Sequence, residues 1–237
     1  MILRAGTIGI DSTSNGGNIF TTDGVVTVNT GATIQTGDLI AVWIGLSASD
    51  NRTVVSVVDN NANGLAQGGY IANNPAFLSS AIWVGIATAP VTSVTITLSA
   101  GFESPAAVAV AGFTLPDATP IGDDAVANAD TTTTHSSGDV TTTAPDAVLL
   151  GCCTSTGTSL TADGNFTTVA NVDDAFFSCV FAYRLLTSTE TRSHVVTAAG
   201  NTSSANVLVE AQGASAGGGG DLNALIGEPI CGSSVLN

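Results

Sequence analysis

The sequence predicts an all-β protein, a jelly-roll or immunoglobulin-like β-sandwich with an internal duplication. Short runs rich in Val, Ile, Thr and aromatic residues are separated by Gly, Asn, Asp and Pro at intervals too close for ordinary helices, and no convincing capped helix is present. Similar runs recur in the same order in the second half of the chain. Since 44% of the 237 residues are hydrophobic, the chain can bury a substantial core.

The expected strands are the runs in which β-branched and aromatic residues dominate between turn signals. They are Val25–Asn29, Asp38–Leu46, Thr53–Val58, Ala81–Thr88, Ser93–Ser99, Ala106–Thr114, Val140–Thr143, Ala147–Thr154, Phe166–Val169, Phe176–Leu186, His194–Ala198 and Ala205–Ala211. The Asn-rich and Gly-containing segments at Asp59 and Asp163 tolerate positive φ, so they are read as hairpin turns.

The duplication is predicted from four pairs of matching elements. They are Asp38–Gly45 with Asp146–Cys153 at an offset of 108, the Asp59 turn with the Asp163 turn at 104, Ser80–Ala87 with Ser178–Leu185 at 98, and Ala106–Gly112 with Ala205–Ala211 at 99. We therefore expect one β-sandwich over 1–212 that is built from two pseudo-repeats, about 20–115 and 136–212.

Some strands are apolar on both faces, so we expect the two repeats to pack together as the halves of a single domain. In the run from Leu39 to Leu46, alternate residues on both sides are apolar. One face can form the sandwich core. The other face must be covered by the second repeat, a loop or another subunit, because large exposed apolar patches are uncommon on soluble monomers. Oligomer formation is one expected means of covering it.

The charge balance excludes two classes of partner. The net charge is −15, with 19 acids against four arginines and no lysine. Nucleic-acid binding needs clustered cations, and here the arginines are scattered, so neither nucleic acid nor an anionic membrane is expected. No secretory signal is visible at the N-terminus and no apolar run is long enough for a membrane helix. Synthesis in a cytoplasm is therefore expected.

The segment after the second repeat has a different composition. Residues 213–220 form a glycine-rich hinge, and residues 221–237 form a tail with its own apolar residues. This tail is the predicted partner interface. Its candidate residues are Leu222, Leu225, Ile226, Ile230, Cys231, Val235 and Leu236.

The order of several motifs resembles a known group of proteins. The motifs are Gly37-Asp-Leu-Ile40, the Asn-rich hairpin from Val57 to Gly64, Ala81-Ile-Trp-Val84, Val94-Thr-Ile-Thr97 and the strand from Ala106 to Phe113. Over roughly residues 20–212 the chain resembles β-sandwich domains of phage virion proteins and of large bacterial surface proteins. The resemblance implies a sandwich used for display, adhesion or capsid reinforcement, and it carries no catalytic residue over.

Between these options the sequence favours a capsid decoration (cement) protein of a bacteriophage. Such a protein would be made in the host cytoplasm and exposed on the virion, and it would bind the major capsid protein or other virion subunits, as a homo-oligomer. The alternative is a carbohydrate- or receptor-binding module of a tail fibre or surface adhesin. For that function Tyr70, in a predicted Gly-Gly-Tyr loop, is the candidate ligand residue, because sugar sites commonly use exposed aromatics.

No catalytic, cofactor or metal site is expected. The only histidines are His135, in a predicted Thr-rich loop, and His194, and neither lies beside a nucleophile motif. The segment Asp59–Gly64 superficially resembles a calcium loop, but Tyr70 occupies the position of the bidentate acid. The adjacent Cys152 and Cys153, and Cys179, are read as small buried hydrophobic residues.

Overall fold

The computed structural model describes residues 9–20, 24–47, 53–73, 76–99, 105–115, 124–143, 145–157, 159–173 and 177–212. For residues 9–20, 73, 105 and 128–130 it describes the backbone only. The predicted hinge at 213–220 and the predicted tail at 221–237, with all its candidate interface residues, lie outside the described residues.

The first repeat contains eight strands. They are β1 (Gly9–Phe20), β2 (Val25–Ile34), β3 (Leu39–Ser47), β4 (Val54–Asp59), β5 (Ala66–Asn73), β6 (Leu78–Ile86), β7 (Val91–Leu98) and β8 (Pro105–Thr114). Their antiparallel pairing makes an inner sheet in the order β1-β8-β3-β6-β5 and an outer sheet in the order β2-β7-β4. Apolar residues of both sheets form a core between them, so this repeat is a two-layer sandwich.

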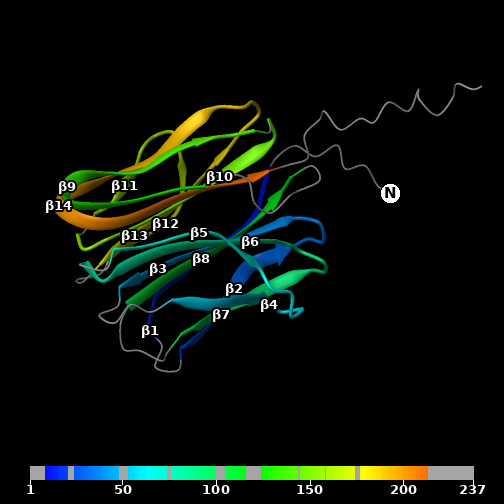
Figure 1. The fold of residues 1–237 in the computed structure, drawn as a ribbon. Helices are drawn as coiled ribbons and strands as arrows, with labels where there is room; N and C mark the ends of the chain where they lie inside the picture. The colour runs from blue at the N-terminus through cyan, green and yellow to red at the C-terminus, as the bar shows by residue number, and fades with distance from the viewer. Residues whose placement is uncertain are drawn as a thin grey trace, which may run out of the picture.

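The second repeat follows the same path with fewer, longer strands. They are β9 (Asp124–Thr141), β10 (Ala147–Ser155), β11 (Thr161–Ala162), β12 (Thr167–Asp173), β13 (Ser178–Leu185) and β14 (Thr191–Gln212). The later half of β14 pairs with β10 and the early half of β9, whereas its early half pairs with β11 and the late half of β9. Figure 1 shows β9 and β14 curving together at the left end of the molecule.

This curvature lets two strands serve both sheets of the second sandwich. Val196 and Ala198, in the early half of β14, pack against Cys153 of β10 and Val180 of β13. The early half of β14 therefore lies across the outer face of the sheet that its later half helps to form. In the first repeat the corresponding path is divided into β1 and β2 and into β7 and β8.

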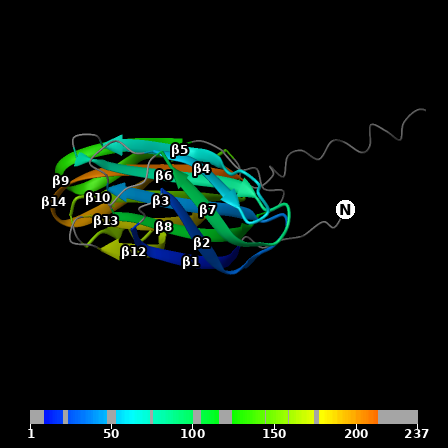
Figure 2. The ribbon, with the colours of Figure 1, turned by 90° about the horizontal axis from the view of Figure 1, so that it is seen from below.

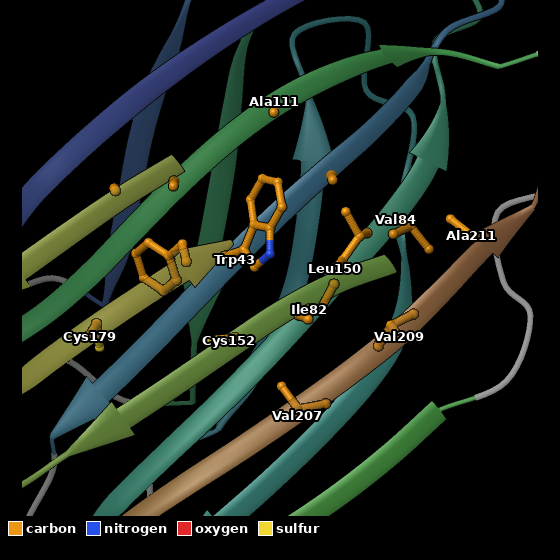
Figure 3. Packing of buried hydrophobic residues seen from close by; sticks show 14 of the residues in the cluster. Trp43, Ile82, Val84, Ala111, Leu150, Cys152, Cys179, Val207, Val209 and Ala211 are labelled. Carbon is orange, nitrogen blue, oxygen red and sulfur yellow. The ribbon is translucent and has the colours of Figure 1, made fainter. Parts of the chain in front are cut away.

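The two inner sheets pack face to face, so the molecule is a stack of four layers (Figure 1). Figure 2 views the same stack from below, where the sheets lie over one another. The shared core between them contains Trp43, Ile82 and Phe113 of the first repeat, together with Leu150 and Val207 of the second. Figure 3 shows Trp43 among these side chains. The second apolar face of β3 is thus covered within its own repeat, and the first face by the other repeat.

Polar side chains at one end of the shared core also join the repeats. Thr154 of β10 donates a hydrogen bond from Oγ1 to the carbonyl oxygen of Ser79 at 3.1 Å, and its Oγ1 lies 2.8 Å from Ser80 Oγ. Ser80 Oγ lies 2.8 Å from the carbonyl oxygen of Ala205. Gly45 permits this approach, because a Cβ there would lie 2.1 Å from Cys179 Sγ.

The register of the duplication differs from the prediction by one residue on each inner strand. Val148, Leu150 and Cys152 face the shared core, as do Leu39, Ala41 and Trp43. The matching residues of β3 and β10 are therefore 109 apart (148 minus 39), not 108. By the same criterion β6 and β13 match at 99 (181 minus 82), not 98, and β8 and β14 at 98 (207 minus 109), not 99. A shift of one residue moves every side chain of a strand to the opposite face of the sheet, and similarity of residue type alone cannot detect such a shift.

The prediction of an all-β sandwich fold is confirmed: the described residues contain no α-helix and most lie in antiparallel strands. In place of the expected single sandwich over 1–212, each repeat has an inner and an outer layer with its own core between them. The choice between a jelly roll and an immunoglobulin-like sandwich stays a prediction.

Strand β1 was not predicted, so the first repeat begins before the predicted residue 20, and two further strand segments were predicted to be loops. Strand β9 begins at Asp124, so His135 lies in a strand and the second repeat begins before the predicted residue 136. Strand β5 was missed because its Gly68-Gly69 pair reads as a turn. A Cβ at Gly69 would lie 2.6 Å from Val207 Cγ2, so these glycines mark a close approach between the inner sheets.

Candidate interaction surface

Both histidines lie in a buried polar network inside the second sandwich. The imidazole of His135 lies 2.8 Å from Ser204 Oγ through Nδ1 and 2.9 Å from Thr202 Oγ1 through Nε2. Nδ1 of His194 lies 2.9 Å from Asn206 Oδ1. Because both histidines and Ser204 are 0% exposed, this cluster cannot reach a substrate in solution as the chain is folded.

The hydrogen bonds of Asn206 determine the tautomer of His194. The Asn206 amide nitrogen lies 2.9 Å from the carbonyl oxygen of His194 and donates to it, so Oδ1 is the acceptor. Nδ1 of His194 therefore carries the proton, and Nε2 is a buried acceptor for which the described residues provide no hydrogen-bond partner. Burial lowers the pKa of His194 to about 4 and also lowers the pKa of His135, so both rings are neutral at pH 7.

The cysteines are unsuited to nucleophilic chemistry. Cys152, Cys153 and Cys179 are free thiols with 0% exposure, which confirms the prediction that they are buried hydrophobic residues. Burial raises the pKa of Cys152 to about 12 and raises the pKa values of Cys153 and Cys179 well above their usual value. A thiolate, the reactive form, is therefore strongly disfavoured at each position.

The Asp59 segment is a turn that the Asp59 carboxylate stabilises. Asp59 Oδ1 accepts hydrogen bonds from the backbone N–H groups of Asn61 at 2.8 Å and Asn63 at 3.0 Å. The side-chain amide of Asn63 donates to Oδ2 at 3.0 Å. The turn in the second repeat uses the same device, because Asp163 Oδ1 accepts from the N–H of Asn165 at 3.1 Å. The carboxylates thus hold the backbone of these turns, and the 104-residue correspondence agrees with the structure.

Tyr70 does not occupy the exposed loop that was predicted for it. It lies in β5 opposite Ala81 and packs, half-buried, against the core of the first repeat. Burial raises the pKa of its hydroxyl, and a side-chain hydrogen bond with Ser79 partly opposes this shift. The structure gathers no second aromatic residue with Tyr70 as an exposed platform among the described residues, so no observation favours a sugar site there.

The outer sheet of the first repeat has a solvent face without charge. Among the described residues from 24 to 115, the only charged side chains are Asp38 and Asp59, and these are just 1% and 4% exposed. Asp38 is turned into a local turn, where its Oδ2 accepts from the N–H of Gln35 at 3.0 Å. The described solvent surface of this repeat is therefore formed by uncharged side chains.

We call the outer side of β2, β7 and β4 the uncharged face. Its residues are Val25, Thr27, Asn29, Val55, Ser56, Thr95 and Thr97. Val25 is 48% exposed and pairs with Thr97, whereas Val55 is 58% exposed and is the extra residue of a β-bulge beside Thr97. Thr27 and Thr95 are hydrogen-bonded between their hydroxyls at 3.0 Å. The described residues of this sheet place no charged side chain on its solvent face, where charge commonly protects exposed strands.

The corresponding outer sheet of the second repeat is charged. Asp139 lies in the late half of β9, and Glu190 and Arg192 adjoin the start of β14. Arg192 Nη2 lies 2.9 Å from Glu190 Oε2, and Arg184 also forms an ion pair with Glu190. The hydrogen bond from Arg184, followed by the contribution of Arg192, lowers the pKa of Glu190. The two outer sheets thus present different surfaces at equivalent places in the fold.

Comparison with family models, curated proteins and solved structures gave no match for this chain. Within the described ranges, no helix is long and apolar enough to cross a membrane, and no group of three or more His, Cys, Asp or Glu residues could hold a metal ion. The candidate functional site is therefore a surface, and it is identified from the residues of this chain alone.

Sequence reasoning did not identify the uncharged face. The predicted interface lay entirely in the tail, outside the described residues. The signal was nevertheless present, because the run from Leu65 to Ser99 contains no charged residue in a chain of net charge −15. What the sequence could not show is that Val25, Val55 and Thr97 lie together, since their proximity depends on the β2-β7-β4 pairing.

Proposed function

We propose that this chain is a non-enzymatic structural protein of a virus particle, of the capsid decoration (cement) type. The observation that carries the proposal is the contrast between an uncharged outer sheet in the first repeat and a charged outer sheet in the second. The uncharged face packs against neighbouring subunits of the particle, and the charged sheet faces water. The virion setting rests on the resemblance of the strand motifs to phage β-sandwich domains.

Electrostatics supports this orientation. Interface cores are depleted of charged residues, whereas solvated surfaces retain them. A chain of net charge −15 repels other acidic surfaces, so a contact that avoids charge has the smallest desolvation and repulsion cost. The joined inner sheets suit a load-bearing role, because the shared core makes the two repeats resist separation.

The buried chemistry supports a non-enzymatic role. The two histidines and the three described cysteines are all 0% exposed, and the pKa shifts keep the histidines neutral and the thiols protonated. These groups fill the interior instead of meeting a substrate.

The test is co-sedimentation of the full chain with particles, or with shells assembled from the major capsid protein of the same virus. Val25→Asp together with Val55→Asp places charge on the uncharged face and should lower particle binding at least tenfold. Thr197→Asp, on the outer sheet of the second repeat, is the matched control and should bind as the wild type does. Wild-type chain that stays in the supernatant at every particle concentration would overturn the proposal.

The predicted tail interface is tested in the same assay. A chain that ends at residue 212 should retain its circular-dichroism spectrum but bind particles more weakly, because the apolar residues of 221–237 supply a second contact. Unchanged binding would confine attachment to the folded body.

A further inference from the structure

We propose that the outer layer of the second sandwich opens in acid, because protonation of His194 releases this layer from the inner sheet while the core between the two repeats stays closed. The outer layer consists of residues 134–141 of β9, residues 191–198 of β14 and strand β11. The switch lies in the other repeat from the uncharged face and needs no partner, so it does not rest on the proposed particle contact.

The ring of His194 divides the core beneath this layer. Along β10 the side of the strand that faces this core carries Leu149, Gly151 and Cys153, and a Cβ at Gly151 would lie 2.6 Å from the His194 ring. Leu149 belongs to one apolar cluster and Cys153 to another, so the polar ring stands between them. The outer layer is therefore not held by one continuous apolar core.

Side-chain hydrogen bonds of both histidines join the two layers. The Nδ1 atom of His194 lies 2.9 Å from Asn206 Oδ1, and the Nδ1 atom of His135 lies 2.8 Å from Ser204 Oγ. Both histidines are in the outer layer, whereas Asn206 and Ser204 lie in the later half of β14, which pairs with β10 in the inner sheet. The imidazole rings are thus part of the connection between the layers, and a change in their protonation acts on it directly.

His194, and not His135, is the trigger. Nδ1 of His194 already donates to Asn206, so an added proton goes to Nε2, for which the described residues provide no acceptor. Both nitrogens of His135 lie beside hydroxyl oxygens, since Thr202 Oγ1 is 2.9 Å from Nε2, and hydroxyl groups can accept from a protonated ring. Protonated His135 can therefore stay in place, whereas protonated His194 has to reach water.

The charges around His194 do not offset this cost. The carboxylate of Asp163, in the turn between β11 and β12, raises the pKa of His194, but burial is the larger effect and lowers that pKa to about 4. Among the described residues, no other charged group hydrogen-bonds to the ring, and Glu190 is paired with two arginines. The other titratable and charged groups on the surrounding elements are His135 and Asp139 of β9, Cys153 of β10, Arg184 of β13, Glu190 just before β14, and Arg192 and Glu210 of β14.

The curved part of the β9–β14 hairpin supplies a hinge (Figure 1). The pairing of the two strands is irregular between Thr197 and Ser204, and Thr131 has a φ of 55°, in the left-handed region. On the outer side of this curve the two strands pair with each other over 191–197 and 134–141. The outer layer can therefore turn away as a paired unit that keeps its own backbone hydrogen bonds.

The chain carries its own reporter of this opening. Cys153 lies beneath the outer layer, whereas Cys152 and Cys179 lie in the core that the repeats share. The experiment is labelling of the full-length Cys231→Ser chain with a dipyridyl disulfide, which reacts with thiols in acid, and glutathione is the reference thiol at each pH. Relative to glutathione, the rate for one thiol should rise about 50-fold between pH 7 and pH 4.5, because the pKa of His194 is about 4 when the layer is closed and 6.5 when it is open. Cys153→Ala should remove that thiol.

Matched substitutions separate the two histidines. His194→Asn keeps a donor to Asn206 but cannot be protonated in this range, so its labelling should stay at the pH 7 rate. His135→Asn should keep the acid response, because His194 is unchanged. The pair His194→Val with Asn206→Val repeats the test with apolar side chains and should also remain closed. Circular dichroism at each pH verifies that every variant is folded.

Three results would overturn the inference. The first is a labelling rate of Cys153 that does not rise between pH 7 and pH 4.5. The second is labelling of Cys152, Cys153 and Cys179 together, because acid would then unfold the whole chain and not one layer. The third is an acid response that His194→Asn leaves unchanged.

Discussion

The two repeats follow the same chain path but differ in the residues of their cores and in the charge of their outer surfaces. Between the sheets of the first repeat the core is mostly aliphatic and includes Val42 and Val108. At the equivalent positions of the second repeat stand Gly151 and Asn206, and the ring of His194 fills the space beside Gly151, where a Cβ would lie 2.6 Å from the ring. The outer surfaces differ in parallel, since the first is uncharged and the second is charged.

This comparison teaches that the two repeats share the arrangement of their inner sheets but differ in the polarity of their outer sheets. The inner faces of both repeats meet in a single core, so a change in one must be matched in the other. Trp43 and its equivalent Cys152 illustrate the constraint, because a large side chain in one repeat stands where the other has a small one. The outer sheets face different surroundings, and each could acquire its own polarity.

The largest expected effect comes from breaking the core that the repeats share. Trp43→Ala should destabilise the protein by about 3–5 kcal/mol, because it removes a fully buried indole. Trp43→Phe should cost far less, since the indole N–H of Trp43 has no hydrogen-bond partner that could be lost. Guanidinium unfolding, followed by circular dichroism, gives the free energies. Equal losses for the two variants would contradict the packing role assigned to Trp43.

The polar core should make the second repeat sensitive to acid. Since burial lowers the pKa of His194 from 6.5 to about 4, the unfolded chain binds a proton over a range in which the folded chain does not. Full stability is present above pH 6.5, and it falls as the pH drops towards 4. At about 1.4 kcal/mol per pKa unit, the loss approaches ~3 kcal/mol, and His135 adds to it in the same direction.

The measurement is the free energy of unfolding at several pH values between 7.5 and 4. The negative charge of Asp163 raises the pKa of His194 and so partly opposes the effect of burial. The loss of stability measured for the wild type therefore includes the contribution of the Asp163 carboxylate. Replacing His194 and Asn206 with Val, the residue type that fills the first core, should flatten the pH dependence. An equally steep loss in this double variant would show that other groups cause it.

A smaller effect is expected from the hydroxyl that links the repeats. Thr154→Val removes a buried donor to the carbonyl oxygen of Ser79 and should cost about 1–3 kcal/mol, because Ser79 and Ser80 lose a partner. Thr27→Val, in an exposed hydroxyl pair of the uncharged face, is the control and should change stability by less than about 0.5 kcal/mol. Thermal unfolding of the two variants separates these outcomes.

The smallest difference should distinguish the two turns. Asp59→Ala removes the acceptor for two backbone N–H groups in a buried position, whereas Asp163→Ala removes the acceptor for one N–H in a more exposed turn. We expect a loss of about 1–2 kcal/mol for the first and about half of that for the second. Urea unfolding measures both, and a larger loss at Asp163 would reverse the assigned roles.

The sequence predicted the fold class well because strand periodicity and turn chemistry are local signals. The Asp59 and Asp163 turns were recognised from residues that tolerate positive φ, and the structure adds that both carboxylates accept hydrogen bonds from the backbone. The predicted register was wrong because the comparison of residue types aligned Leu39 with Ala147, although these two side chains face different cores. Strand β5 was not predicted because Gly68 and Gly69 were read as a turn. These glycines instead allow the close approach of Val207 in β14, which is distant in sequence.

The candidate site was harder to predict than the fold. An uncharged stretch is visible in the sequence, but a face exists only once β2, β7 and β4 are paired. The same limit applies to His135, which looked like a loop residue until its partner Ser204 was brought within 2.8 Å by the pairing of β9 with β14. Long-range pairing, not residue type, decides both features.

The most direct test of the contrast between the outer sheets is thiol labelling of two single-cysteine positions in the presence and absence of virus particles. Val55→Cys and Thr197→Cys are each placed in a Cys231→Ser background, where the buried Cys152, Cys153 and Cys179 do not react. We predict that Val55→Cys becomes protected from a maleimide when the chain is bound to particles, while Thr197→Cys labels at a constant rate. Equal labelling of both positions, with and without particles, would contradict the account.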